Sequence, residues 1–330
     1  MAMIVGWIVM SISFGTVVLF GAVGETLTEK AGNLNLGTPG IMCMGGAFGF
    51  SAVSIYEMNV SKPNAAICIA IALASSFVMG VIGGLIFSFL TTTLRVNQNV
   101  VGLTLTIFGV GLSKFVASFV IPNGSVVTKA DFANKVFITR IPFLSSKLGY
   151  VGELLFSYGF MVYLAIIIAI GATCFLNKTK VGLNLRAVGE NPGTADAAGI
   201  NVTKYKYLAT CIGSGITALG GLYYILDFNN GTWATADGDA IEAVAWLSVA
   251  LVIFIRWKPI NAIWGAYLFG ICYWAYNYFP KITGIKVNTD LTKMLPYVVT
   301  ILVLIITSIK QRKDNQAPAS LGLSYFREDR

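Results

Sequence analysis

Hydrophobic and polar positions are arranged in long blocks along this chain, with apolar runs separated by shorter polar segments. The runs are Met3–Gly24, Leu34–Tyr56, Ala65–Thr93, Val96–Pro122, Leu154–Leu176, Tyr207–Leu226, Ala243–Ile255, Pro259–Pro280 and Met294–Ile309. Most of them reach the roughly 20 residues that a membrane-spanning helix needs. The pattern therefore predicts an all-α integral membrane protein, a polytopic bundle of about nine transmembrane helices, with about eight to ten as the range.

Two of these runs are shorter than a full span. Ala243–Ile255 reaches full length only if its helix takes in Glu242 and also Asp239. Met294–Ile309 is marginal unless Lys293 and Lys310 extend their charged ends to the membrane surface. Both runs are counted as transmembrane spans, and whether each reaches full length depends on the charged residues at its ends.

The distribution of basic residues predicts the orientation. The polar loop between the fifth and sixth runs has five basic residues (Lys178, Lys180, Arg186, Lys204 and Lys206) against Glu190 and Asp196. The carboxyl-terminal tail begins with Lys310, Arg312 and Lys313. Both segments are expected in the cytoplasm, because inner loops are rich in lysine and arginine. Arg95, Arg256 and Lys258 then fall on the same side, and the polar stretch 123–152 and the amino terminus fall outside.

Composition supports a membrane protein and excludes several kinds of chemistry. The chain is 56% hydrophobic and only 12% charged, and its mean hydropathy is +0.74. It has no histidine, and its five cysteines stand singly inside apolar runs, so zinc sites, histidine triads and a disulfide framework lack the residues they need. No G-x-x-x-x-G-K-[ST] motif occurs. The chain is therefore not expected to bind and hydrolyse a nucleotide itself.

The basic loop 178–206 contains the start and stop signals of a short helix. Asn191 is a helix N-cap followed by Pro192 in the first turn, and Gly199 is a C-terminal stop. The predicted helix Pro192–Ala198 is about seven residues or about 10 Å long, too short to be stable alone. Its own protein must hold one side, and a partner is expected on the other. The alternative interpretation is a charged cytoplasmic connection without a partner.

Two motifs resemble one known family. The segment Arg186–Tyr207, RAVGENPGTADAAGINVTKYKY, looks like the cytoplasmic coupling loop of ABC-importer permeases of the branched-chain amino acid, ribose and nucleoside type. The segment Glu29–Gly40, EKAGNLNLGTPG, resembles an early signature of the same permeases. The resemblance extends from about Gly15 to Ile309. Within the family it is closest to nucleoside permeases that work with lipoproteins of the basic-membrane-protein type.

The resemblance implies how energy enters the protein. In this family the short helix of the loop docks in a groove of a separate ATPase subunit, whose closure moves the membrane spans. The residues it assigns to this coupling are Glu190, Asn191, Pro192, Ala195, Asp196, Ala197, Ala198 and Gly199. Asp196-Ala197-Ala198-Gly199 stands where many such permeases have Glu-Ala-Ala followed later by Gly, so the individual docking contacts are not carried over.

The second motif has two interpretations. Asn33, Asn35, Gly37 and Gly40 interrupt a helix between the first two spans. Irregular backbone at membrane depth occurs only where protein or water satisfies its amides, so these residues are candidates for a polar substrate pathway. The alternative is a tight cytoplasmic turn that begins at Glu25. Glycines at Gly83–Gly84, Gly220–Gly221 and Gly213-x-Gly215 are expected to let helices pack closely.

Glu242 is a further candidate for the substrate pathway, because carboxylates inside membranes usually face a cavity or a partner. The alternative places Glu242 at the outer edge of the membrane, where it and its acidic neighbours Asp237 and Asp239 meet water. Lys114 is interpreted as an anchor that extends to the membrane surface.

Together these observations predict one transmembrane permease domain over residues 1–309, with its coupling loop at 178–206, and a disordered cytoplasmic tail over 310–330. The chain is expected to be a non-enzymatic subunit of an ATP-driven importer in a bacterial cytoplasmic membrane. Expected partners are membrane lipid, a second permease of the same or another kind, two ATPase subunits that carry ATP and Mg²⁺, and an external binding lipoprotein. No cofactor is expected in this chain, nor any nucleic-acid partner.

The predicted solute is a nucleoside, with riboflavin, simple sugars and branched-chain amino acids as alternatives. The rival class is an ion-coupled secondary transporter, in which Glu242 and Lys114 would sense the ion.

Overall fold

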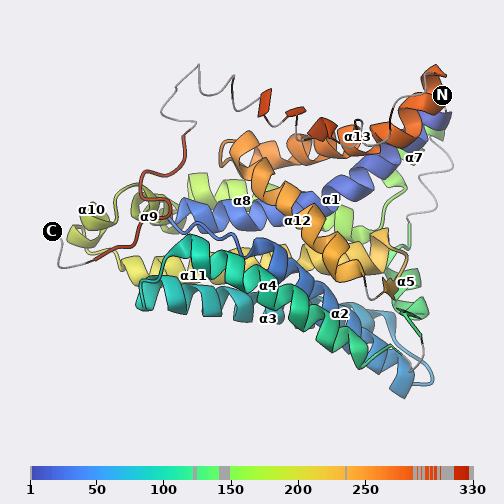
Figure 1. Cartoon of the computed structure of the whole chain (residues 1–330), viewed down its shortest axis with the longest axis horizontal. Helices are drawn as coiled ribbons and strands as arrows, with labels where there is room; N and C mark the ends of the chain where they lie inside the picture. Colours follow the sequence, from blue (N-terminus) through green and yellow to red (C-terminus); the bar gives the residue numbers. More distant parts are fainter. Residues whose placement is uncertain are drawn as a thin grey trace.

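A computed structural model describes residues 2–121, 125–140, 149–234, 236–284 and 316–326, with a few single positions between 288 and 305. The long helices are α1 (Ala2–Lys30), α2 (Thr38–Asn59), α3 (Ala65–Ser88), α4 (Gln98–Ser118), α8 (Phe160–Lys178), α11 (Val202–Tyr223), α12 (Asp237–Phe254) and α13 (Pro259–Thr283). Most of them run roughly along the long axis of the molecule, and α12 crosses it obliquely (Figure 1). The described chain is thus the helical bundle that the sequence predicts.

Shorter elements join these helices. They are α5 (Asp131–Phe137), α7 (Gly149–Phe156), α9 (Lys180–Glu190), α10 (Pro192–Ala197), the π-helical turns η1 (Phe89–Thr93) and η2 (Tyr224–Phe228), and the strands β1 (Val127–Lys129) and β2 (Thr232–Ala234). The two strands pair antiparallel, with Thr128 opposite Trp233.

Within the described ranges, six helices are long and apolar enough to cross a membrane. They are Met3–Lys30, Thr38–Asn59, Ala65–Thr93, Gln98–Ser118, Phe160–Lys178 and Val202–Phe228. This supports a multi-pass membrane protein but is fewer than the predicted number of spans. The first two turns of α12 contain three carboxylates, and α13 contains asparagines, tyrosines and a lysine. The predicted span Met294–Ile309 lies largely outside the described residues.

Two helix boundaries test the sequence analysis directly. The short run at Ala243 was expected to need Glu242 and Asp239, and α12 does begin at Asp237 and include both. By contrast, the predicted continuous span Leu154–Leu176 is wrong. The chain breaks between α7 and α8 at Gly159, which is extended and caps α8. A Cβ at Gly159 would clash with the Asp227 carboxylate and with the Phe137 carbonyl oxygen, so only glycine fits at this break.

Helix α11 lies at the centre of the bundle, where it packs against α1, α2 and α3. Small residues allow this close approach, as the sequence predicts. Gly24 of α1 and Gly213 of α11 face each other, and a Cβ on either would clash with the backbone oxygen of the other. A Cβ at Gly221 would likewise clash with the carbonyl oxygen of Met42 on α2. In a membrane such backbone contact replaces the hydrophobic driving force of soluble bundles.

The connections gather at the two ends of the bundle. In Figure 1, α9, α10 and the carboxyl terminus lie at one end, and the amino terminus, α5 and α7 lie at the other. The pairing of β1 with β2 joins the stretch 123–152 to the connection between α11 and α12, whose acidic residues Asp227, Asp237 and Asp239 also predict an outer position. Arg95 lies over the ring of Phe326, which joins two segments that are both predicted to lie inside. Residues predicted to share a side of the membrane therefore share an end of the structure.

The tail differs from its prediction. The sequence predicts disorder over 310–330, whereas residues 316–326 are packed against the end of the bundle that carries α9 and α10. Pro318 and Ser320 are buried, and the Ser320 backbone N–H donates to the Gly189 carbonyl at 3.0 Å. The segment is ordered because it finds hydrogen-bond partners, which its own composition does not reveal.

We expect a single added methyl group at Gly221 to destabilise the bundle. Gly221→Ala should lower the melting temperature of the detergent-solubilised protein by several degrees, because overpacking typically costs about 1–3 kcal/mol. The matched control is Gly111→Ala on α4, where an added Cβ meets no atom within 4 Å. Equal melting temperatures for the two variants would contradict the packing described here.

Candidate coupling site and substrate pathway

The loop between α8 and α11 folds into two short helices with well-defined caps. The Asn191 side chain accepts from the Thr194 backbone N–H at 3.0 Å and so caps α10. Gly199 ends α10 with φ +82°, and its N–H donates to the Asp196 carbonyl at 2.9 Å. Asn201 then caps α11 by accepting from the Lys204 N–H at 2.9 Å. The predicted helix Pro192–Ala198 is thus present, with Ala198 as its C-cap.

Helix α10 has one face toward its own protein and one toward solvent. Ala195 is buried in a small apolar cluster with Val188 of α9 and Val202 of α11. Ala197, Ala198 and Gly199 are exposed on the other side. Helix α10 is therefore a six-residue helix with an exposed edge of small residues.

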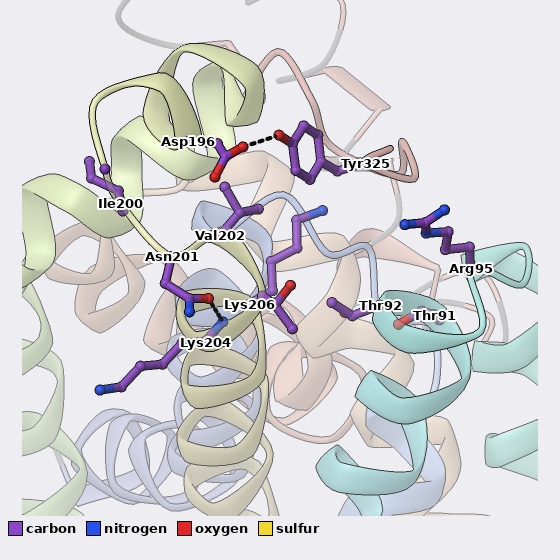
Figure 2. A pocket seen from close by; sticks show the side chains of 12 residues that line it. Thr91, Thr92, Arg95, Asp196, Ile200, Asn201, Val202, Lys204, Lys206 and Tyr325 are labelled. Carbon is purple, nitrogen blue, oxygen red and sulfur yellow. Dashed lines mark hydrogen bonds between the residues drawn. The ribbon is translucent and has the colours of Figure 1, made fainter. Parts of the chain in front are cut away.

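The carboxyl-terminal segment holds the acidic residues of the loop. The Tyr325 hydroxyl donates to Asp196 Oδ2 at 2.9 Å, and Figure 2 shows this hydrogen bond above the start of α11. The Ala319 backbone N–H donates to Glu190 Oε2 at 3.3 Å. Of the predicted coupling residues, Ala195 is therefore buried, and Glu190 and Asp196 are hydrogen-bonded to the tail. Sequence reasoning did not identify Tyr325, although SLGLSYF in a charged tail was an available signal.

A polar cavity of about 620 Å³ opens beside α10. Its walls include Asp196 and Gly199 from the loop, Arg95 from the segment before α4, and Lys204 and Lys206 from α11 (Figure 2). Lys206 is only 3% exposed, and its ammonium donates to the Leu323 carbonyl at 3.5 Å. The cavity thus joins the coupling loop, the end of α3 and the tail in one basic region.

The asparagines of the second motif are buried in the turn between α1 and α2. The Asn35 N–H donates to Glu25 Oε1 at 3.1 Å, and the Asn35 side chain accepts from the Gly37 N–H at 2.9 Å. The Asn33 amide donates to Thr210 Oγ1 at 2.9 Å, and its oxygen accepts no hydrogen bond from the residues that the structure describes. Asn35 therefore shapes the turn, and Asn33 attaches it to α11.

The glycines of this motif serve packing against α4. A Cβ at Gly37 would lie 2.9 Å from the Leu105 side chain, and one at Gly40 would lie 2.6 Å from Thr106 Cα. The structure thus brings Asn33, Asn35, Gly37 and Gly40 together, but in helix and turn contacts. A substrate pathway past them stays a prediction, and the Asn33 oxygen is the polar group it would use.

Two buried carboxylates organise the same region. Glu25 accepts from the Thr38 hydroxyl as well as from Asn35, and Glu29 accepts from the indole N–H of Trp257 between α12 and α13. From the sequence, Glu25 is predicted only as the start of a turn, and Glu29 only as part of the motif Glu29–Gly40. The sequence places both carboxylates in the last turns of an apolar helix. That position was the available signal of a buried, partnered role, because buried carboxylates in membranes need partners.

The remaining candidates lie on α12 and α4, away from the turn. Glu242 is half-buried in the second turn of α12 and accepts from the Trp246 indole at 3.4 Å. Lys114, interpreted as an anchor, forms an ion pair with Asp239 at 2.7 Å. Glu242 is thus separate from Asn33 and from α10, and the structure does not assemble the predicted site residues into one site.

This chain is similar in sequence to known proteins. Residues 7–304 match the family described as branched-chain amino acid transport system, permease component. A putative glucose ABC transporter permease of Haloferax volcanii is 30% identical, over 96% of each chain. The nucleoside ABC transporter permease NupC of Lactococcus lactis is 28% identical, over 95% of this chain and 94% of its own.

The guanosine ABC transporter permease NupQ of Bacillus subtilis is also 28% identical, over 94% of this chain and 92% of its own. No solved structure matches significantly. The relatives thus span both nucleoside and sugar permeases.

The cap of α10 can be tested by hydrogen exchange. Asn191→Ala should speed amide deuterium exchange over residues 192–198, because loss of an N-cap costs about 0.5–2 kcal/mol of helix stability. Asn64→Ala is the control, because Asn64 caps α3 in the same way through the Ala66 N–H. Exchange over 192–198 that is the same in both variants would contradict this cap.

Proposed function

Because this chain belongs to the family of branched-chain amino acid transport system permease components, we propose that it moves nucleosides across a membrane. The chain is the permease subunit of an ABC importer, a transport component rather than an enzyme. Two relatives that align over at least 94% of this chain are named for nucleoside and guanosine transport. A sugar is the second candidate, since a glucose permease relative aligns over 96% of it.

The single observation that carries the coupling mechanism is the arrangement of α10. This helix is capped at both ends, buried through Ala195 and exposed at Ala197–Gly199. In our proposal the exposed edge docks in a groove of an ATPase subunit. Closure of the ATPases displaces α10, and α11, which starts five residues beyond α10 and runs through the bundle centre, carries that displacement. Only a difference in contacts between two states lets ATP shift the transport equilibrium.

The permease family works with ATPase and substrate-binding partners. We propose two ATPase subunits carrying ATP and Mg²⁺, a second permease of the same or another kind, and an external binding lipoprotein. The proposed location is a bacterial cytoplasmic membrane, with the amino terminus outside and the carboxyl terminus inside, in about nine spans. The domain limits 1–309 and the coupling loop 178–206 are part of this proposal.

Coupling through α10 can be tested in proteoliposomes that contain the assembled importer. The double variant Asp196→Lys with Gly199→Leu should lower transport per ATP hydrolysed by about tenfold, within the usual range of allosteric coupling. Gly199 has φ +82°, so leucine there strains the end of α10. The control is Gly171→Leu on α8, where an added Cβ meets open space.

The rival class predicts the opposite result. If the chain were an ion-coupled transporter, Glu242→Gln would abolish transport and the α10 variants would leave it intact. Normal transport in the α10 double variant would therefore overturn the proposed mechanism.

The solute can be tested on the cognate binding protein without the membrane subunits. A thermal-shift screen should show stabilisation by nucleosides, by about 2.7 kcal/mol at a ligand concentration 100-fold above Kd. Glucose, riboflavin and branched-chain amino acids are tested in parallel. A shift with one of these and with no nucleoside would replace the nucleoside assignment.

A further inference from the structure

The carboxyl-terminal segment 317–326 lies between α9–α10 and the turn that joins α1 to α2. On the loop side, the Ser320 backbone N–H and hydroxyl both donate to the Gly189 carbonyl, at 3.0 and 2.5 Å. The Tyr325 hydroxyl donates to Asp196 on α10, and the Tyr325 side chain packs against the apolar cluster around Ala195. The segment therefore holds both α9 and α10.

The same segment holds the turn between α1 and α2. The Gly322 N–H, two residues after Ser320, donates to the Gly32 carbonyl at 3.2 Å. A Cβ at Gly322 would lie 3.9 Å from the Leu34 Cβ, so the two backbones run in contact. Ser320 and Tyr325 thus bind the coupling loop, and Gly322 between them binds the turn.

Gln98 extends this connection. Its side-chain oxygen accepts from the Leu34 N–H at 2.7 Å, and its amide nitrogen donates to the Leu323 carbonyl at 3.4 Å. The buried Lys206 ammonium, from the second turn of α11, donates to the same carbonyl at 3.5 Å. Leu323 therefore lies where the turn, α4 and α11 meet.

Ordering such a segment costs conformational entropy of about 1–2 kcal/mol for each residue. The contacts to both sides offset that cost only while the loop and the turn keep their relative positions. A displacement of α10 consequently either moves the turn with it or breaks these hydrogen bonds.

We propose that residues 317–326 are a second coupling element, which positions α10 and carries its displacement to the turn that holds Asn33. The proposal rests on the proposed function, because it takes α10 as the point of contact with the ATPase. Ser320 and Tyr325 are its positioning residues: they act through Gly189 and Asp196 and do not contact the solute. Motion at α10 reaches the bundle by two routes, along α11 and through this segment.

The first test compares hydroxyl deletions within the segment. In the reconstituted importer, Ser320→Ala with Tyr325→Phe should lower transport per ATP hydrolysed by about fivefold. The maximal ATPase rate and the amount of assembled complex should stay unchanged, which separates positioning from folding. The control is Ser324→Ala, which removes the same hydroxyl group from the same segment. A coupling ratio equal to that of the control would overturn the proposal.

The second test locks the segment to the turn. In a background without the five native cysteines, Leu34→Cys with Gly322→Cys places two Cβ atoms at about the separation that a disulfide spans. Gly322 has φ +79°, so cysteine strains the segment in both redox states, and the comparison is made between the oxidised and reduced forms of this one variant. If the segment and the turn move together, the oxidised protein should retain transport, equal to that of the reduced protein. Loss of transport on oxidation, with recovery on reduction, would show that they must separate and would overturn the proposal.

The α10 double variant distinguishes the two levels of failure. If Asp196→Lys with Gly199→Leu leaves transport intact, the proposed function fails. If that variant uncouples transport while Ser320→Ala with Tyr325→Phe behaves like Ser324→Ala, only the role of the tail fails.

Discussion

The turn between α1 and α2 obeys the constraint on which much of this structure depends. Where a helix breaks inside a membrane protein, each freed backbone group needs a partner from the protein itself. Glu25 accepts from the Asn35 N–H, Gln98 accepts from the Leu34 N–H, and the Gly32 carbonyl accepts from Gly322. These partners come from α1, α4 and the tail. One short break therefore requires three segments, distant in sequence, to meet at one end of the bundle.

Helix α11 connects this end to the centre. It begins at a cap four residues after α10 and then packs against α1, α2 and α3 through glycine and alanine. Thr210, in its third turn, accepts from the Asn33 amide, so the turn is attached to α11 as well as to the tail. Because these contacts are backbone-to-backbone or buried hydrogen bonds, they leave little room for α11 to slide independently.

The sequence predicted those features that local chemistry determines. Apolar runs gave the long helices, Asn191 and Gly199 gave α10, and the length of the run at Ala243 required the carboxylates that α12 includes. The break at Gly159 was missed, because the close approach of Asp227 and Phe137 that requires glycine there comes from distant parts of the chain. The buried tail was missed for the same reason: its partners lie on α9, α4 and the α1–α2 turn.

The order of synthesis gives the tail a further consequence. Residues 316–326 are synthesised after every helix that they contact, and chains fold from the amino terminus during synthesis. Until then the Gly32 carbonyl and the Lys206 ammonium lack the partners that Gly322 and Leu323 supply. The end of the bundle that carries α9 and α10 therefore gains these hydrogen bonds only after all the helices that the segment contacts have been made.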